Sequence, residues 1–293
     1  MKGLSIERLA TFCSIVESGS IVEAARGDSV RQSQFSRQLK ELENALGTLL
    51  FHRKGRVWEL TGEGRKLALL TRSYFDELTL LASGTPAVPR MIRVGAGESI
   101  LDGLIFPKMG ELRQAFPSAI FEFSSMPTKE LIAELNSGSL DLVIVREEVV
   151  ESEHNARFFH NLQFKLVVPR SLLHERMPAG LKDIQDIPIA MLSGRGSYAS
   201  AMSRLADQAG IRLRIAVCAQ SFPQMCHLMK SGNFAGVLPS WHTPQFASDQ
   251  FSTITLDSLD TLSRKLVLVR HKRIEMFRTD IARMTPKFVS LLA

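Results

Sequence analysis

The chain has 293 residues, which is enough for two domains that each bury an ordinary core. Hydrophobic residues make up 45% and charged residues 23% of it, which is the composition of a folded globular protein and excludes a disordered or membrane-embedded one. Three scattered cysteines are too few for a secreted disulfide framework, and a net charge of +6 is compatible with an acidic partner without identifying one.

The N-terminus shows no pattern of an export signal or a membrane anchor. Glu7 and Arg8 interrupt its apolar residues. No run of the sequence approaches the roughly 18 apolar residues that a membrane span requires. We therefore expect a cytoplasmic protein with no membrane partner.

Two short helices are predicted at the N-terminus. Ser5 is a candidate N-cap, and Gly19 can end the first helix in the left-handed conformation. The first helix has one apolar face, made of Leu9, Phe12, Cys13 and Val16. Ser20 and Glu23 have the spacing of a capping box, which predicts a very short second helix.

A third helix is predicted from the turn at residues 27–29 to about Asn44. Ser29 and Gln32 form a second capping-box pattern, so Ser29 is the expected N-cap. One face is apolar, with Phe35, Leu39, Leu42 and Leu46. The opposite face carries hydrogen-bonding and basic side chains able to reach base edges or phosphates, namely Arg31, Gln32, Ser33, Gln34, Ser36, Arg37 and Lys40. This pattern is typical of a helix-turn-helix DNA-binding unit, although a solvated surface helix would show the same polarity.

A basic hairpin follows the third helix. Arg53, Lys54 and Arg56, with Gly55, form a predicted basic turn before the predicted strand 57–60, which indicates a wing that contacts the DNA backbone or minor groove. Residues 31–66 hold eight basic and four acidic side chains, an excess that suits phosphate contact.

A long amphipathic helix is predicted after the hairpin, from about residue 62 to 82, with Thr61 as its cap. Its apolar residues have heptad-like spacing, at Leu67, Leu70, Tyr74, Leu78 and Leu81. Because such a helix leaves its own domain and has little else to pack on, we expect it to pair two chains.

These N-terminal residues resemble the DNA-binding domain of the LysR-type transcriptional regulators. The matching residues are Leu9, Phe12, Val16, Gly19, Ser20, Ala24, Ala25, Gln32, Ser36, Arg37, Gln38, Leu39, Leu42, Glu43, Leu46, Gly47, Leu50, Phe51, Arg53, Leu60, Thr61 and Gly64. The resemblance implies a winged helix-turn-helix at residues 1–65 and a dimerisation helix with a hinge at 66–90. Asp28, Arg31 and Ser33 depart from the family pattern, so the base preference of relatives does not carry over.

The remaining sequence predicts an α/β fold. Residues 83–89 contain two prolines and a glycine and are expected to form a linker. Strands are predicted at residues 91–95, 119–124, 140–145, 164–168, 189–192, 214–219, 235–238 and 266–270, and helices at 105–116, 129–136, 197–208, 222–230 and 274–292. This alternation favours parallel sheets.

The second half also resembles the effector domain of the LysR family, which is similar to a periplasmic solute-binding protein. The matching pieces are Gly138–Leu142 and, further along, Gly232 with Val237–Pro239. The resemblance implies a two-lobed effector-binding domain at 91–293. Lobe I is then expected at 91–161 and 268–293, and lobe II at 162–267.

Polar residues follow the predicted strands at the ends where two-lobed α/β domains bind ligands. The candidate effector-binding residues are Glu98, Ser99, Ile100, Thr128, Arg146, Ser193, Ser221 and Phe222. Hydroxyls at Ser99, Thr128 and Ser221 precede predicted helices, whose free amides suit an anion, although each could also be only an N-cap. Arg146 could add a charge-assisted bond or pair with neighbouring acids. We expect a small, anionic metabolite that also offers Glu98 a hydrogen-bond donor or a positive group.

No catalytic, metal or cofactor pattern is present in the sequence. The seven histidines lack metal-ligand spacing, and residues 194–197 lack the lysine of a P-loop. One LysR branch senses peroxide through two lobe II cysteines, which makes a redox role for Cys218 and Cys226 an alternative. The corresponding positions here are Ser197 and Ala206, so we favour buried core thiols.

The sequence therefore predicts a transcription regulator and not an enzyme. Its expected partners are double-stranded operator or promoter DNA, the metabolite effector, further copies in a homodimer or homotetramer, and RNA polymerase if it is an activator. The alternative is a solute-binding protein without a transcriptional role. Residues 1–65 argue against the alternative, since a solute receptor needs an export signal and has no use for a basic winged helix.

Overall fold

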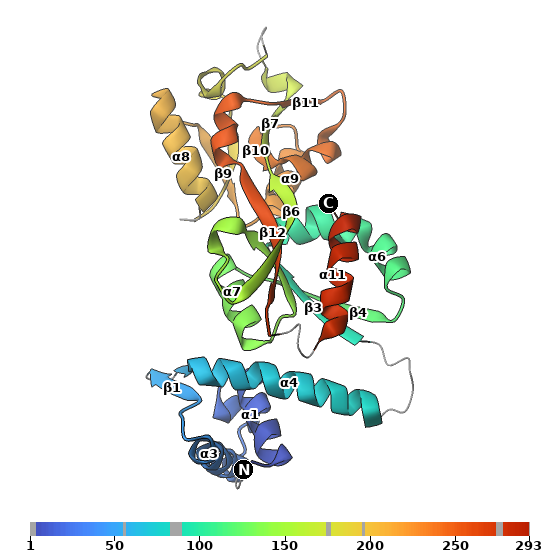
Figure 1. The fold of residues 1–293 in the computed structure, drawn as a ribbon. Helices are drawn as coiled ribbons and strands as arrows, with labels where there is room; N and C mark the ends of the chain where they lie inside the picture. Colours follow the sequence, from blue (N-terminus) through green and yellow to red (C-terminus); the bar gives the residue numbers. More distant parts are fainter. Residues whose placement is uncertain are drawn as a thin grey trace.

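The computed structural model describes residues 4–54, 57–82, 90–173, 177–194, 197–273 and 278–292. A helical N-terminal domain lies at one end, followed by a long helix and two α/β lobes (Figure 1). The predicted linker at 83–89 and the hairpin residues 55–56 lie outside these ranges. Among the residues that are described, no helix is long and apolar enough to span a bilayer.

The N-terminal domain has the predicted helices and hairpin, which are α1 (Ile6–Ser18), α2 (Ile21–Ala24), α3 (Ser29–Leu46), β1 (Phe51–Lys54) and β2 (Val57–Leu60). Two predicted caps are confirmed, because the Ser5 and Ser20 side chains accept bonds from the backbone N–H groups of Arg8 and Glu23. Gly19 ends α1 with a φ of 73°, in the left-handed region expected for it.

The predicted cap of the third helix is wrong. Asp28 caps α3, because its Oδ1 accepts from the backbone N–H groups of Val30 at 2.8 Å and Arg31 at 3.1 Å. Ser29 is instead the first helical residue. A carboxylate can accept both bonds and also interacts favourably with the positive end of the helix dipole.

The apolar stripe of α3 is buried only in part. Leu39 and Leu42 lie in the core of the N-terminal domain, with 4% and 0% of their surface exposed. Leu46, the last residue of the predicted stripe, is 37% exposed. The predicted long helix is confirmed as α4 (Gly62–Ala82), and the Thr61 hydroxyl accepts from the Gly64 N–H at 2.9 Å.

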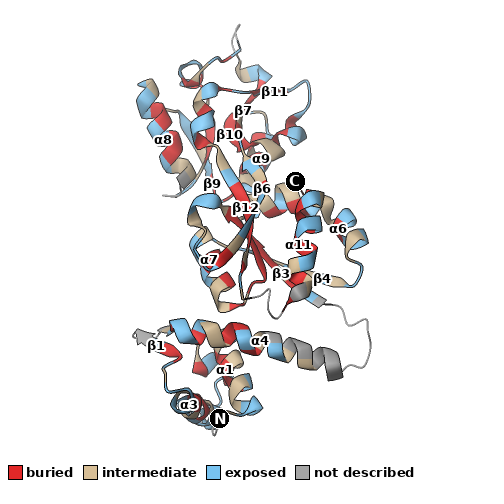
Figure 2. Cartoon of the chain, in the orientation of Figure 1, coloured by how far each residue is buried: buried red, intermediate tan, exposed pale blue. Residues whose placement is uncertain are grey.

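Lobe I contains a five-stranded sheet in the order β4-β3-β5-β12-β6. Its strands are β3 (Arg90–Ala96), β4 (Ala119–Ser125), β5 (Leu142–Arg146), β6 (His154–Leu162) and β12 (Arg264–His271). Helices α6 (Met109–Ala115) and α11 (Thr279–Leu292) pack on one face, and α7 (Thr128–Ser137) packs on the other. Figure 2 shows the resulting buried layer along the centre of the lobe.

Lobe II is built around β7 (Phe164–Pro169), which pairs with β10 (Gly236–Pro239) and β11 (Phe251–Ile254). A parallel pair, β8 (Ile189–Leu192) and β9 (Ile215–Ala219), lies beside them. The helices are α8 (Ser197–Ala209) and α9 (Phe222–Met229). The short elements of the two lobes are α5 (Glu98–Ile100), η1 (Leu101–Ile105), η2 (Phe106–Lys108), η3 (Glu147–Val149), η4 (Arg170–Leu172), η5 (Leu181–Ile184), η6 (Ser240–Phe246) and η7 (Asp257–Leu262).

The predicted parallel pairing is confirmed for β3 with β4 and β5 and for β8 with β9, but the other pairs of the two lobes are antiparallel. The chain enters lobe II directly from β6 into β7 and returns through β12, and these connecting strands pair antiparallel with their neighbours. Strands β6 and β11 were not predicted. The return strand begins at Arg264, before the expected boundary at residue 268.

Candidate DNA-binding surface and effector crevice

The outer face of α3 is the candidate DNA-reading surface. Its exposed side chains are Arg31, Ser33, Gln34, Ser36, Arg37 and Lys40, while Gln32 is half-buried. The opposite face packs on the core through Leu39 and Leu42. Six of the seven predicted α3 residues are therefore exposed, as contact with base edges requires, and Gln32 lies at the margin of the buried face.

A polar network holds α3 against α1. Gln38 is only 7% exposed, its Oε1 accepts from the Thr11 hydroxyl, and its Nε2 donates to Glu7 Oε1 at 2.7 Å. Beside it, the Arg8 guanidinium forms an ion pair with Glu41. The sequence analysis missed these roles. The available signal was a glutamine beside Leu39 on the apolar face of the helix, where a buried amide needs partners.

The wing is a hairpin in which β1 and β2 pair at four positions, and it is anchored on the domain core. Arg53 and Lys54 belong to strand β1, opposite Trp58 and Val57, instead of the turn in which they were predicted. Trp58 makes an edge contact with Phe51, with ring centroids 5.6 Å apart. Arg56 lies outside the described residues.

The predicted dimer stripe of α4 is partly exposed. Leu70 and Tyr74 have 42% and 45% of their surfaces exposed, and Leu67 packs against the N-terminal core. Leu78 is half-buried, and the Leu81 side chain lies outside the description. Leu70 also lines a groove of about 460 Å³ together with the exposed Leu46.

At the junction between the lobes, the start of α5 meets the start of α9. The Ser221 hydroxyl donates to Glu98 Oε1 at 3.0 Å, across the two lobes. Ser221 is 8% exposed and is also the N-cap of α9, accepting from the Gln224 N–H. This bond brings together two residues that the sequence placed at the effector site.

A second contact between the lobes joins Ser99 to η6. The Ser99 hydroxyl lies 2.9 Å from His242 Nε2, and the Trp241 indole N–H lies 3.1 Å from both the hydroxyl and the carbonyl oxygen of Ser99. His242 Nδ1 is 3.8 Å from the Asp102 carboxylate. Burial lowers the pKa of His242, and the nearby Asp102 carboxylate opposes that shift.

Aromatic rings pack together on the lobe II side of this junction. Phe222 packs against Tyr198, with centroids 5.1 Å apart, and stacks on His242 at 6.4 Å. The Tyr198 hydroxyl donates to the Val237 carbonyl at 2.8 Å, and burial raises its pKa. Sequence reasoning found Phe222 but missed His242 and Tyr198, because no local pattern separates these residues from ordinary core residues.

The other predicted effector residues do not take part in these contacts between the lobes. Thr128 and Arg146 line a wide cleft of about 1090 Å³ between the N-terminal domain and α7. Ser193, at the end of β8, donates its hydroxyl to the Ala219 carbonyl at 3.0 Å. Ile100 packs against the lobe I core. Of the three hydroxyls considered as caps, only that of Ser221 caps a helix, since Gly97 and Pro127 precede α5 and α7.

The cysteines differ from the buried pair that was expected. Cys226 is 2% exposed, and burial raises the pKa of its thiol to about 12, which keeps it protonated and unreactive. Cys218, in contrast, is exposed on β9, so its interpretation as a core residue is wrong. Among the described residues, no group of three metal-binding side chains comes together.

Two family models match this chain. The model of the LysR substrate binding domain matches residues 88–278, and the model of the bacterial regulatory helix-turn-helix protein, lysR family, matches residues 6–65. The second match argues against a solute-binding protein without a transcriptional role.

Named relatives agree with the family models. The HTH-type transcriptional regulator TtuA of Agrobacterium vitis is 26% identical over 303 residues, covering 96% of this chain and 98% of TtuA. BenM of Acinetobacter baylyi is 28% identical over 172 residues, covering 57% of this chain and 56% of BenM.

Solved structures share the fold. A full-length OxyR variant from Pseudomonas aeruginosa has a TM-score of 0.67 at 17% identity, covering 98% of this chain and 97% of that chain. CbnR in complex with its target DNA has a TM-score of 0.57 at 19% identity, covering 99% of this chain and 100% of that chain. Because family models match both the helix-turn-helix and the two-lobed domain, the chain belongs to the LysR family of DNA-binding transcription regulators with a C-terminal substrate-binding domain.

Proposed function

We propose that this regulator binds its operator through α3 and the wing, and that a small anionic metabolite in the crevice between the lobes modulates operator binding or promoter activation. The observation that carries the DNA-binding part is the exposed polar face of α3, which is held in one orientation by the bonds of Gln38 to α1. Side chains fixed in this way can make directional bonds to base edges.

In this proposal α3 enters the major groove. Gln32, Gln34, Ser36 and Arg37 lie nearest the bases or flanking phosphates, and Arg31, Ser33 and Lys40 contact the backbone. The wing residues Arg53, Lys54 and Arg56 contact the backbone or minor groove. Phosphate contacts of this kind supply affinity, and the base contacts supply specificity.

Fluorescence anisotropy on DNA from upstream of the regulator's own gene tests the assignment of α3. We expect Gln34→Ala and Arg37→Ala each to weaken operator binding by about 1–3 kcal/mol, with little change on scrambled DNA for Gln34→Ala. Arg204→Ala, an exposed arginine on α8, is the matched control and should bind like the wild type. If both α3 variants kept wild-type operator affinity, another surface would read the DNA.

We further propose a two-fold dimer that forms through α4, and a tetramer in which two dimers join through their effector domains. The exposed Leu70 and Tyr74 support the dimer, because a pairing helix needs an uncovered apolar stripe. A two-fold dimer also matches operators with two half-sites.

For the effector site, we propose Glu98, Ser99, Ser221 and Phe222 as the contact residues. A metabolite carboxylate would replace Glu98 beside Ser221, at the positive end of α9. The released Glu98 carboxylate would then accept a hydrogen bond from a donor on the same metabolite. The contact of Ser221 with Glu98 supports this proposal, since it already pairs a carboxylate with that position.

A thermal-shift screen of small carboxylates tests the effector site. A metabolite that binds only the folded protein raises the melting temperature by mass action. We expect Ser99→Ala to reduce that rise, and Thr128→Ala, whose side chain lines the other cleft, to preserve it. If the metabolite raised the melting temperatures of Ser99→Ala and Thr128→Ala equally, the assignment of Ser99 to the effector site would be contradicted.

The partner DNA also leads us to propose a cytoplasmic location, because the operator and RNA polymerase are there. If the regulator is an activator, RNA polymerase is a further partner.

A further inference from the structure

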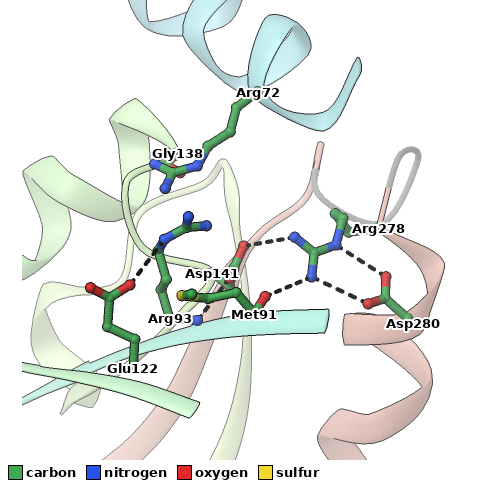
Figure 3. Close-up of polar contacts among 8 residues, drawn as sticks. All are labelled: Arg72, Met91, Arg93, Glu122, Gly138, Asp141, Arg278 and Asp280. Atoms are coloured by element: carbon green, nitrogen blue, oxygen red, sulfur yellow. Dashed lines mark hydrogen bonds and ion pairs between the residues drawn. The ribbon is translucent and has the colours of Figure 1, made fainter. Parts of the chain in front are cut away.

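The loop Gly138–Asp141 connects α7 to β5 and lies against the long helix α4. From the sequence alone, this segment was noted only for its resemblance to the LysR effector domain. Figure 3 shows Arg72 reaching from α4 toward Gly138, with Asp141 and its arginine partners below. The loop is therefore one of the places where α4 touches lobe I.

The first contact is the packing of Leu69 against Gly138. Leu69 belongs to α4, yet it is 5% exposed and lies within the apolar core cluster of lobe I. A Cβ atom on Gly138 would lie 2.7 Å from Leu69 Cδ2, so glycine is what lets the helix approach. Gly138 also has a φ of +83°, which disfavours any side chain there.

The second contact is a hydrogen bond. Arg72 Nη1 donates to the Gly138 carbonyl oxygen at 2.9 Å. Gly138 caps the C-terminus of α7, where the carbonyl groups carry a partial negative charge, so a guanidinium is well placed there.

The loop that receives α4 is tied to the rest of lobe I. Asp141 is 4% exposed, its Oδ2 accepts from the Arg93 N–H at 2.8 Å, and its Oδ1 lies 3.6 Å from Arg278. Arg278 also donates to the Met91 carbonyl and to Asp280 at the start of α11 (Figure 3). A displacement of the loop would therefore move β3 and α11 as well.

We propose that the loop Gly138–Asp141 is the docking site, or seat, of α4 on lobe I. We further propose that this seat transmits the conformational state of the effector-binding domain to the DNA-binding heads, which are the winged helix-turn-helix domains. The proposal rests on the proposed effector control of DNA binding. A rigid contact of one glycine, one leucine and one arginine sets the angle between α4 and the sheet, and a change in that angle changes how two heads reach two half-sites.

Hydrogen exchange on the full-length protein tests whether the seat exists in solution. Arg72→Ala and Gly138→Ala should raise the exchange rate of amides in residues 136–142 several-fold, because α4 no longer covers them. Arg72→Lys keeps a donor for the carbonyl and should preserve protection. Gly232→Ala is the matched control for Gly138→Ala, since Gly232 has a φ of +75° with open space around it and so adds the same backbone strain without the clash.

DNA binding by the same variants tests transmission, on an operator first identified by selection from random DNA. We expect Arg72→Ala and Gly138→Ala to bind a single half-site like the wild type but to differ several-fold from it on the complete operator, with an altered footprint. Unchanged exchange in residues 136–142 would overturn the seat. If the two variants showed faster exchange in residues 136–142 but bound the complete operator like the wild type, the seat would exist without transmitting the effector signal, and that part of the proposal would be overturned. Selection that enriches no operator for the wild type would instead contradict the proposed function, and unchanged exchange would still overturn the seat.

Discussion

At the scale of single residues, the orientation of α3 depends on an amide that faces inward. Gln38 bonds to Thr11 and Glu7 of α1 from the buried side of α3. A rotation of α3 about its own axis would break these bonds and displace every outward side chain together. We therefore assign Gln38 the role of positioning the helix, without contact to DNA.

Replacing Gln38 tests this positioning role. Gln38→Leu leaves the Thr11 hydroxyl buried without its partner, so urea unfolding should show a loss of about 1–3 kcal/mol. Operator affinity should fall more than affinity for scrambled DNA. Gln34→Leu, on the exposed face of the same helix, should change stability by less than about 0.5 kcal/mol. A parallel fall on both kinds of DNA would indicate a purely structural role for Gln38.

Asp28 gives a second prediction at this scale. Asp28→Ala removes both bonds to the first amides of α3 and should cost about 0.5–2 kcal/mol of unfolding free energy. Asp28→Asn keeps an acceptor and should retain most of that energy. Ser29→Ala should be nearly neutral, and a large loss in that variant, measured by the same urea titration, would restore Ser29 as the cap.

At the scale of elements, α4 has three roles along one length. Its first turns close the N-terminal core, Leu69 and Arg72 face lobe I, and Leu70 and Tyr74 remain exposed. Because residues 69 and 70 point in different directions on a helix, one element can hold lobe I and still offer a stripe to another copy.

Charging the exposed stripe should separate the copies. Leu70→Glu and Tyr74→Glu each place a carboxylate where we propose a second α4, so light scattering should show a lower mass and operator affinity should fall. Val22→Glu is the matched control, since Val22 is an exposed apolar residue on α2 that lies outside the groove beside Leu70. An unchanged mass in both α4 variants would place the dimer contact elsewhere.

Elements with a local signal could be predicted from the sequence. The caps at Ser5 and Ser20 and the left-handed Gly19 are set within a few residues, and the structure confirms all three. Strands β6 and β11 were missed because their status depends on pairing with strands distant in the sequence. The exposure of Leu46 could not be predicted either, since spacing defines a stripe but not what covers it.

The candidate effector site shows the same limit. Glu98 and Ser221 could be chosen because each follows a predicted strand, and the structure joins them by a hydrogen bond. Ser99 is 142 residues from Trp241 and 143 residues from His242 in the sequence, so no window of sequence contains their contact. Residues that meet only through the folding of two lobes require the structure.

At the scale of the whole molecule, polar contacts of a few side chains join the two lobes. They run from Ser221 to Glu98, from Trp241 and His242 to Ser99, and from His242 to Asp102. His242 is the titratable group of this junction that is most enclosed, with 3% of its surface exposed. The groups that face it are the Asp102 carboxylate, the Ser99 hydroxyl and the rings of Trp241 and Phe222.

The junction should weaken in mild acid. Burial lowers the pKa of His242 below the ordinary imidazole value of about 6.5, so the unfolded chain binds more protons than the folded one as the pH falls. His154, His160 and His271 have pKa values lowered in the same direction. The contribution of these four histidines to the free energy of unfolding is therefore fully present above about pH 6.5. It declines below that pH until the imidazoles of the folded protein also take up protons.

Thermal unfolding between about pH 7.5 and about pH 5.5 measures this decline. His242→Gln can keep a hydrogen bond to Ser99 without a titrating ring, so its melting temperature should depend less steeply on pH than that of the wild type. His227→Gln is the matched control, because His227 is exposed on α9 and keeps most of its hydration on folding. Since the contact of His242 with Ser99 bridges the lobes, scattering should also show the wild type expanding more than His242→Gln on acidification. If the melting temperatures of the wild type and His242→Gln depended equally on pH, protonation of His242 would not weaken the contact between the lobes.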